Sequence, residues 1–196
     1  MTRIIAGQWK GRTLKVPPSV TRPTSSRVRE AIFSSITHQL EAFDDIRVLD
    51  LYAGSGALGL EAISRGAEFA TFVDSDRNAC DCVKGNAQQL GARNLSVVQN
   101  SVAKFLAPET DTNSMRSDLV FIDPPYALSD TEIANIIDLL DKHGWLNDEA
   151  LVVVERSSKS TVKWPSSFEA LHNKTYGDTS IWYGLYSADR VEGVKE

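Results

Sequence analysis

The sequence predicts an α/β fold, doubly wound around a mostly parallel sheet, with a small N-terminal β extension and a C-terminal antiparallel hairpin. From residue 46 onward, short apolar runs alternate with segments of helical periodicity, the pattern of parallel strands joined by helices on both faces of a sheet. A glycine-rich string, GSGALG at 54–59, follows the first of these runs and opens the first helix. The tail from residue 161 holds two β-like runs that break at YGD (176–178).

The chain opens with a segment expected to form a strand or hairpin, because IIAGQWKGRTLKVP (4–17) contains two short β-like runs split by glycines. VPPSVTRPTSS (16–26) is punctuated by prolines and is predicted to be a linker. A helix should follow, with its N-cap at Ser25 or Ser26. Its apolar residues fall on one face and are Val28, Ala31, Ile32, Ile36 and Leu40.

The remaining elements follow in order along the chain. Strands are expected at 48–53, 70–74, 95–100, 118–123 and 150–156. Helices are expected at 56–66, from the second strand to about residue 90, and around 130–142. The sequence contains no internal repeat and no clear second globular domain, as suits a chain of 196 residues.

Composition excludes several classes of protein. No stretch has the apolar length of a membrane span, and the N-terminus lacks the apolar core of a secretory signal, so we expect a cytoplasmic protein. Cys80 and Cys82 lie two apart on a predicted helix and point to different faces, which argues against a disulfide. The three histidines are scattered, and no set of residues has metal-ligand spacing. We therefore expect no metal.

Charge is distributed unevenly along the chain. The net charge is −5, but residues 1–30 carry seven basic residues and one acid, a net of +6, so the remainder carries −11. A basic face can neutralise phosphates while the rest of the protein stays acidic. Residues 1–24 are therefore predicted to be a β-hairpin extension and linker that face a nucleic acid, RNA if the resemblance described below holds, and residues 25–196 to be the main domain. The predicted RNA-binding residues are Lys10, Arg12, Lys15, Arg22 and Arg27, with contacts to SAM or within the fold as the alternatives for Arg22, Arg27 and the neighbouring Arg29.

The glycine string predicts a nucleoside cofactor. Gly54 and Gly56 would let the backbone approach a ligand, and Gly59 would let the helix pack closely on the sheet. Asp74 ends the second strand, twenty residues after Gly54, where a carboxylate can accept hydrogen bonds from ribose hydroxyls.

This spacing alone leaves the choice between NAD and S-adenosylmethionine (SAM) open. A dehydrogenase usually needs a substrate domain or an acid–base set, and the chain shows neither. SAM has no pyrophosphate, and Asp50 in the first strand places a second carboxylate near the loop, where it suits a cationic amine and sulfonium. A helix-capping role for Asp50 is the alternative.

A strand that ends in FIDPPY (121–126) suggests the substrate. Each proline restricts the residue before it to extended conformations, so Asp123 and the Pro124 carbonyl form a stiff pair of acceptors. Two acceptors suit the two N–H bonds of an exocyclic amine, and Tyr126 offers a flat face on which a base can stack. Hydrogen bonds to both N–H groups would favour the pyramidal amine and aim its lone pair at a methyl sulfonium. Asp123 would also receive the released proton.

These motifs resemble a known family. DPPY resembles the motif of amino-directed SAM methyltransferases. Together, RIIAGQWKGRTL, TRPTSSRVREAIF, VLDLYAGSGALGLEAISRGA, FVDSD and FIDPPY resemble the RsmD family of bacterial 16S rRNA guanine-N2 methyltransferases, over nearly the whole chain. The resemblance implies a class I SAM-dependent methyltransferase fold, which is Rossmann-like. It also implies that the substrate is one guanine of 16S rRNA in assembling or assembled small ribosomal subunits. We expect a monomer.

The resemblance also implies roles for individual residues. The methionine part of SAM would lie against Asp50, Gly54, Ser55 and Gly56. Asp74 would hold the ribose, and Asp76 or Arg77 would lie beside the adenine. Asn100 and Ser101 follow the third strand near the adenine amine, although relatives more often carry aspartate where this chain has Ser101. The catalytic residues that hold the target base would be Asp123, Pro124 and Tyr126.

Three other functions are weighed against guanine-N2 methylation. The same DPPY chemistry would serve an adenine-N6 methyltransferase on DNA or RNA, although the chain has no sizeable target-recognition domain for DNA. A catalytically silent RNA-binding or ribosome-assembly factor would not need to keep Gly54, Asp74 and Asp123 together. A dehydrogenase is the least favoured of the hypotheses.

Overall fold

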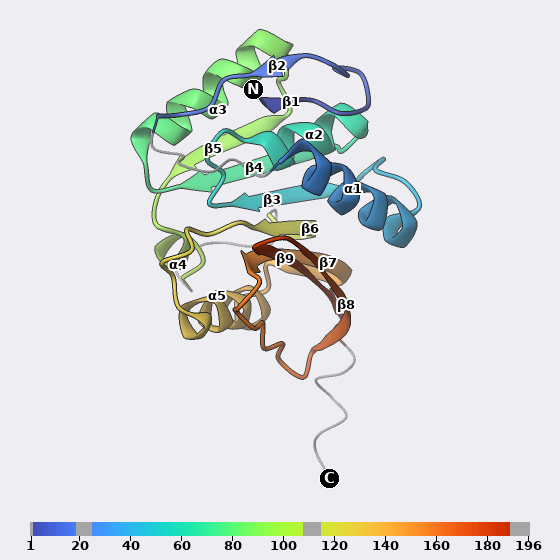
Figure 1. Ribbon diagram of the computed structural model, residues 1–196, viewed down its shortest axis with the longest axis vertical. Helices are drawn as coiled ribbons and strands as arrows, with labels where there is room; N and C mark the ends of the chain where they lie inside the picture. Colours follow the sequence, from blue (N-terminus) through green and yellow to red (C-terminus); the bar gives the residue numbers. More distant parts are fainter. Residues whose placement is uncertain (1, 19–24, 108–114, 189–196) are drawn as a thin grey trace. The chain divides into compact units, whose positions relative to one another are not determined.

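The computed structural model describes residues 2–18, 25–107 and 115–188 (Figure 1). Packing divides the chain into two compact units, residues 1–101 and 102–196. Each unit is described by itself below. Within the described ranges, no helix combines the length and apolar character needed to cross a membrane.

The first unit contains three parallel strands in the order β5-β4-β3. They are β3 (Arg47–Leu51), β4 (Phe69–Asp74) and β5 (Leu95–Gln99). Leu49, Leu51, Phe72 and Val73 are fully buried, as expected for strands covered by helices. Because the strands are parallel, β3 and β4 end on the same edge, where the loops that follow them meet.

The described residues of this unit form three helices: α1 (Ser26–Leu40), α2 (Ala57–Arg65) and α3 (Arg77–Leu90). The Ser25 hydroxyl accepts the Val28 N–H and caps α1, as predicted. Arg29 on α1 is buried rather than available to RNA, and its guanidinium donates to the Arg3 carbonyl at 3.0 Å. Burial lowers the pKa of this guanidinium, while the Glu61 carboxylate opposes that effect.

The predicted N-terminal β extension is present but its strands are short. Antiparallel pairs join β1 (Thr2–Arg3) to β2 (Thr13–Leu14). We call residues 2–16 the N-terminal arm. Figure 1 shows the arm, in blue, lying against the helices of the first unit.

Two residues of α2 fasten the first half of the arm. The buried carboxylate of Glu61 accepts the Ile5 N–H at 2.6 Å and the Ala6 N–H at 2.9 Å. Ser64 donates its hydroxyl to the Ala6 carbonyl at 2.6 Å. Gly7 has φ +78°, and a Cβ at this position would lie 1.7 Å from the Ser64 carbonyl oxygen. The arm is therefore an integral part of the first unit.

In the second unit, the described residues form four strands, which lie in the order β6-β7-β9-β8, and two helices. Its elements are α4 (Val102–Phe105), β6 (Ser117–Ile122), α5 (Asp130–Lys142), β7 (Leu146–Ser157), β8 (Phe168–Tyr176) and β9 (Thr179–Tyr186). β6 and β7 are parallel, whereas β9 pairs antiparallel with both β7 and β8. The buried Trp145 ring packs on Phe105 and donates its indole N–H to the Leu106 carbonyl at 3.3 Å.

The predicted fold class is confirmed: the described residues form an α/β fold whose seven main strands pair mostly in parallel and end in an antiparallel hairpin. Two strand starts differ most from the prediction: the first strand of the C-terminal hairpin, β8, begins at Phe168 rather than near 161, and β7 begins at Leu146 rather than at 150. Its first residues include Asn147, Asp148 and Glu149, and Glu149 has φ +61°. This polar, irregular start has no apolar run by which a strand could be predicted.

Candidate active site

The glycine loop connects β3 to α2 with a backbone of mostly positive φ. Tyr52, Gly54 and Gly56 have φ of +62°, +54° and +73°. Such values suit the two glycines, but they are unusual for a residue as bulky as tyrosine. Strained backbone of this kind concentrates at functional sites. Tyr52 was missed from the sequence, because nothing in LDLYAG marks a left-handed tyrosine.

Asp74 organises the mouth of this loop. One carboxylate oxygen accepts the Gly54 N–H at 2.9 Å, and the other accepts the Asp76 N–H at 2.9 Å. The Asp74 carbonyl accepts the Asn100 N–H at 3.0 Å. Asp76 in turn caps α3 by accepting the Asn78 N–H at 2.9 Å. The structure therefore brings together four of the residues predicted to bind the cofactor.

Asp50 has a structural partner in the same region. It is buried, and its carboxylate accepts the Gly59 N–H in the first turn of α2 at 2.9 Å. A Cβ on Gly59 would lie 2.4 Å from the Phe72 ring, which explains the close approach of α2 to β4. The helix-capping alternative for Asp50 is thus present in the structure, and a contact with SAM is kept as a proposal.

The other two predicted cofactor residues differ in exposure. Ser55 is buried, and its carbonyl accepts the Asn86 side-chain N–H at 2.9 Å. Ser101 is exposed at the end of the first unit. Asn86, fully buried on α3, was also missed from the sequence.

In the second unit, β6 runs directly into the DPPY segment. Pro124 is buried, Asp123 is half-buried, and Tyr126 is 44% exposed to solvent. The Tyr126 hydroxyl shares a hydrogen bond of 2.8 Å with the Thr179 hydroxyl at the start of β9. The Leu128 N–H donates to the Pro125 carbonyl at 3.0 Å and closes a turn after the motif. Tyr126 is therefore partly exposed to solvent while its hydroxyl is held by Thr179.

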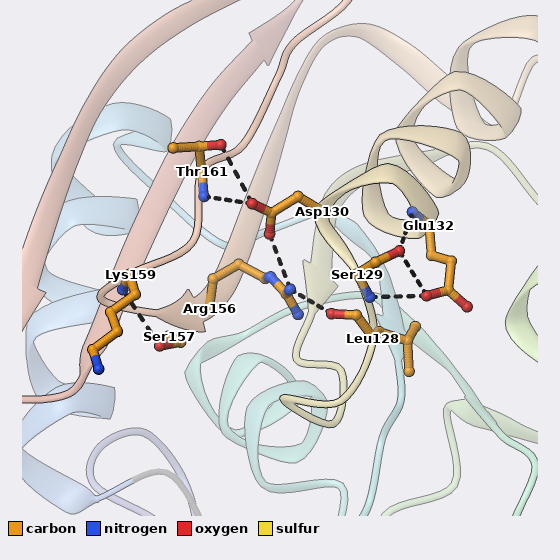
Figure 2. Close-up of polar contacts among 8 residues, drawn as sticks. All are labelled: Leu128, Ser129, Asp130, Glu132, Arg156, Ser157, Lys159 and Thr161. Carbon is orange, nitrogen blue, oxygen red and sulfur yellow. Dashed lines mark hydrogen bonds and ion pairs between the residues drawn. The ribbon is translucent and has the colours of Figure 1, made fainter.

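Arg156 of β7 holds the end of that turn (Figure 2). The residue is 2% exposed, and its guanidinium donates to the Leu128 carbonyl at 2.6 Å and to the Asp130 carboxylate at 3.1 Å. Asp130 also accepts the Thr161 N–H at 3.0 Å. The Thr161 N–H and the Arg156 guanidinium hold the pKa of the Asp130 carboxyl below its ordinary value.

The same loop is fixed on its other side by the start of α5. Ser129 and Glu132 form a capping box: each side chain accepts the backbone N–H of the other. Figure 2 shows this box beside the Arg156 contacts. The segment that follows Tyr126 is thus held by both β7 and α5.

The bond between Tyr126 and Thr179 can be tested from both ends. Tyr126→Phe and Thr179→Val each remove it and keep the shape of the side chain. We expect each to slow methyl transfer roughly 2- to 10-fold, the worth of one neutral hydrogen bond at about 0.5–1.5 kcal/mol. The double variant should be no slower than the slower single variant, as measured by transfer rate at saturating SAM. Additive losses would show that the two residues act independently.

The predicted RNA-binding residues fall into three groups. Lys10, Arg12 and Lys15 are exposed on the arm, and Arg12 donates to the Gln89 carbonyl at 3.0 Å. Arg27 is exposed on α1. Arg22 lies outside the described residues. Among the described residues, no group of three or more histidine, cysteine, aspartate or glutamate side chains could hold a metal ion.

Comparison with known proteins supplies the family. The family model described as Conserved hypothetical protein 95 matches residues 2–185. The chain belongs to this family. It is the RsmD family that the sequence motifs resemble.

Relatives from this family resemble the chain over both units. "Ribosomal RNA small subunit methyltransferase D" of Escherichia coli K12 is 39% identical over 188 residues, covering 95% of this chain and 90% of the relative. The Haemophilus influenzae protein of the same name is 38% identical over 190 residues, covering 94% and 92%. The solved structure of yhhF from Escherichia coli has a TM-score of 0.84 at 36% identity, covering 95% of this chain and 98% of that chain.

Proposed function

We propose that this RsmD-family chain is a SAM-dependent methyltransferase that methylates the exocyclic N2 amine of a guanine in 16S rRNA. The DPPY segment carries the proposal, since the half-buried Asp123 and the exposed Tyr126 follow β6 in a chain of this family. The relative from Escherichia coli is named a small-subunit rRNA methyltransferase, which supports rRNA as the substrate. The choice of guanine N2 rests on the resemblance to the family and on the amine-binding chemistry of DPPY.

The residues at the mouth of the glycine loop fit SAM. A carboxylate oxygen offers about two acceptor sites, and within the described part of the chain each Asp74 oxygen accepts one backbone N–H. Each oxygen therefore has acceptor capacity left for a ribose hydroxyl. When bound, SAM supplies an electrophilic methyl group on its sulfonium. Asp74 would hold the ribose, and the backbone of Gly54 to Gly56 would lie along the methionine part.

The DPPY residues would prepare the amine. Asp123 and the Pro124 carbonyl accept its two N–H bonds, and the rigid proline backbone keeps these acceptors in place. Tyr126 stacks on the base, with its ring angle set by the bond to Thr179. Asp123 would accept the proton that the amine loses when it takes the methyl group supplied by SAM, which would leave as S-adenosylhomocysteine.

One assay separates guanine N2 methylation from its rivals. The protein is incubated with labelled SAM and either naked rRNA or small subunits that lack the modification, and the digested nucleosides are identified. N2-methylguanosine supports the proposal, and N6-methyladenosine would replace it with the adenine hypothesis. No incorporation on either substrate would favour a silent assembly factor. We also propose that the protein acts on the small ribosomal subunit in the cytoplasm, and that it does so as a monomer.

The arm is proposed to bind RNA phosphates through Lys10, Arg12 and Lys15. Replacing all three with glutamine should reduce the salt dependence of RNA binding by about two units of log–log slope, because each phosphate contact contributes roughly 0.7–0.9. SAM affinity should stay unchanged. The measurement is binding to rRNA or small subunits across a salt series.

A matched control tests whether the effect is specific to the arm. Lys142, Lys159 and Lys163 are exposed in the second unit, and their replacement by glutamine removes the same charge. This control should keep the wild-type slope. Equal slopes for the arm variant and the wild type would place the RNA-binding face elsewhere.

A further inference from the structure

One side chain in the first unit joins two segments with different proposed roles. Asn86 of α3 is fully buried. Its Oδ1 accepts the Lys15 N–H at 2.8 Å. Its Nδ2 donates to the Lys15 carbonyl at 3.0 Å and to the Ser55 carbonyl at 2.9 Å. A single carboxamide therefore bridges the N-terminal arm and the glycine loop.

The arrangement uses both amide hydrogens of Asn86. Nδ2 has two hydrogens, and two carbonyl oxygens lie at 2.9 and 3.0 Å from it. Its contact with the Cys82 sulfur, at 3.7 Å, is the weakest of the three. Turning the amide over would point Nδ2 at the Lys15 N–H, two donors facing each other. The hydrogen bonds therefore select one orientation of the Asn86 amide, and they link the Lys15 backbone to the Ser55 backbone.

Other side chains hold the arm without touching the loop. Glu61 and Ser64 of α2 bind residues 5, 6, 8 and 9. Gln89, one turn after Asn86 on α3, donates to the Thr13 carbonyl at 3.1 Å. Of the described contacts, those of Asn86 are distinguished by reaching both segments. This gives Gln89 the properties of a matched control.

We propose that Asn86 is a positioning residue that couples RNA binding on the arm to SAM binding on the glycine loop. The inference rests on the proposed function of both segments. A ligand that orders the loop fixes the Ser55 carbonyl, and through Asn86 it also fixes the Lys15 backbone. The second ligand then has less ordering to impose, so each ligand raises the affinity of the other by the same factor.

The coupling is measured with S-adenosylhomocysteine, the demethylated product, which binds without turnover. Its dissociation constant is determined with and without unmodified small subunits, for wild type, Asn86→Asp and Gln89→Ala. Asn86→Asp keeps the size of the side chain and the acceptor for the Lys15 N–H but loses both donors. In the wild type, we expect the dissociation constant without small subunits to be about fivefold or more larger than the one with them, at the lower end of typical coupling. The ratio should fall to about one in Asn86→Asp.

Gln89→Ala should weaken RNA binding yet keep the wild-type ratio. A residue with only a structural role would shift both dissociation constants of Asn86→Asp together and leave their ratio unchanged. A wild-type ratio in folded Asn86→Asp therefore overturns the proposal, and so does a lost ratio in Gln89→Ala.

Hydrogen exchange decides the link without RNA. Adding S-adenosylhomocysteine should slow exchange of the Lys15 amide in the wild type and in Gln89→Ala, but not in Asn86→Asp. An unchanged Lys15 amide in the wild type refutes the connection between loop and arm. If the wild type fails to bind small subunits while its Lys15 amide responds, the proposed RNA function fails and the connection stands.

Discussion

Replacing Asp123 with alanine is expected to abolish methyl transfer and to leave SAM affinity close to the wild-type value. The carboxylate is assigned to the target amine, where it accepts an N–H bond and then the released proton. Loss of a positioned general base alone typically costs 10²- to 10⁴-fold in rate. Loss of the amine acceptor adds to this. The two measurements are single-turnover transfer and calorimetry with SAM.

Two variants sharpen this prediction. Asp123→Asn keeps an acceptor oxygen but takes up no proton, so it should remain slow at every SAM concentration. Asp118 is the second residue of β6 and accepts a hydrogen bond from the Asn147 side chain at 2.7 Å. Asp118→Ala removes a carboxylate from the opposite end of β6 and should keep most of the activity. A tenfold loss of SAM affinity in folded Asp123→Ala would move Asp123 into the cofactor site.

Asp74→Ala should have the reverse effect, a loss of SAM affinity that saturating SAM largely repairs. A hydrogen bond to a charged group is worth about 1.5–3 kcal/mol, so affinity should fall roughly tenfold or more. The structure adds a second reason for a large effect. Asp74 also holds the Gly54 and Asp76 amides, so its removal releases the loop that would bind the methionine part.

Asp76→Ala separates these two reasons. It removes the cap of α3 but leaves both Asp74 contacts possible, since the Asp76 backbone N–H remains. A cap is worth about 1 kcal/mol of stability. We therefore expect a lower unfolding temperature with a smaller loss of SAM affinity. An unchanged SAM dissociation constant in Asp74→Ala would contradict the role of Asp74.

The sheet could be predicted because its signals are local. Apolar runs such as VLDL and LVFI mark strands that are buried on both faces, and Ser25 and Gly66 mark helix ends within a few residues. The start of β7 lacked such a signal. There, Asn147 and Asp148 occupy a strand whose pairing with β6 shifts register between Ser117 and Leu119.

The candidate site likewise contains residues that could be predicted from the sequence and residues that could not. Gly54 and Asp74 could be paired from the sequence because adjacent parallel strands end on one edge, which brings residues twenty apart within hydrogen-bonding distance. Asn86 and Thr179 could not, because an asparagine in a helix or a threonine after a turn is ordinary in sequence. Their partners lie 71 and 53 residues away. Only the folded chain brings such residues together.

The docking of the arm has a consequence for how the chain is made. The arm leaves the ribosome before its partners do, because Glu61, Asn86 and Gln89 follow its contact residues by 56, 71 and 76 positions. Until α3 has emerged, the cationic arm lacks its folded partners and lies undocked beside the ribosome's own RNA. All of these partners lie within the first unit, which is complete at residue 101. Since domains fold in order of synthesis, the arm packs onto α2 and α3 before the second unit is finished. Protease cleavage within residues 2–16 of stalled nascent chains should therefore cease once stalling occurs well beyond residue 101.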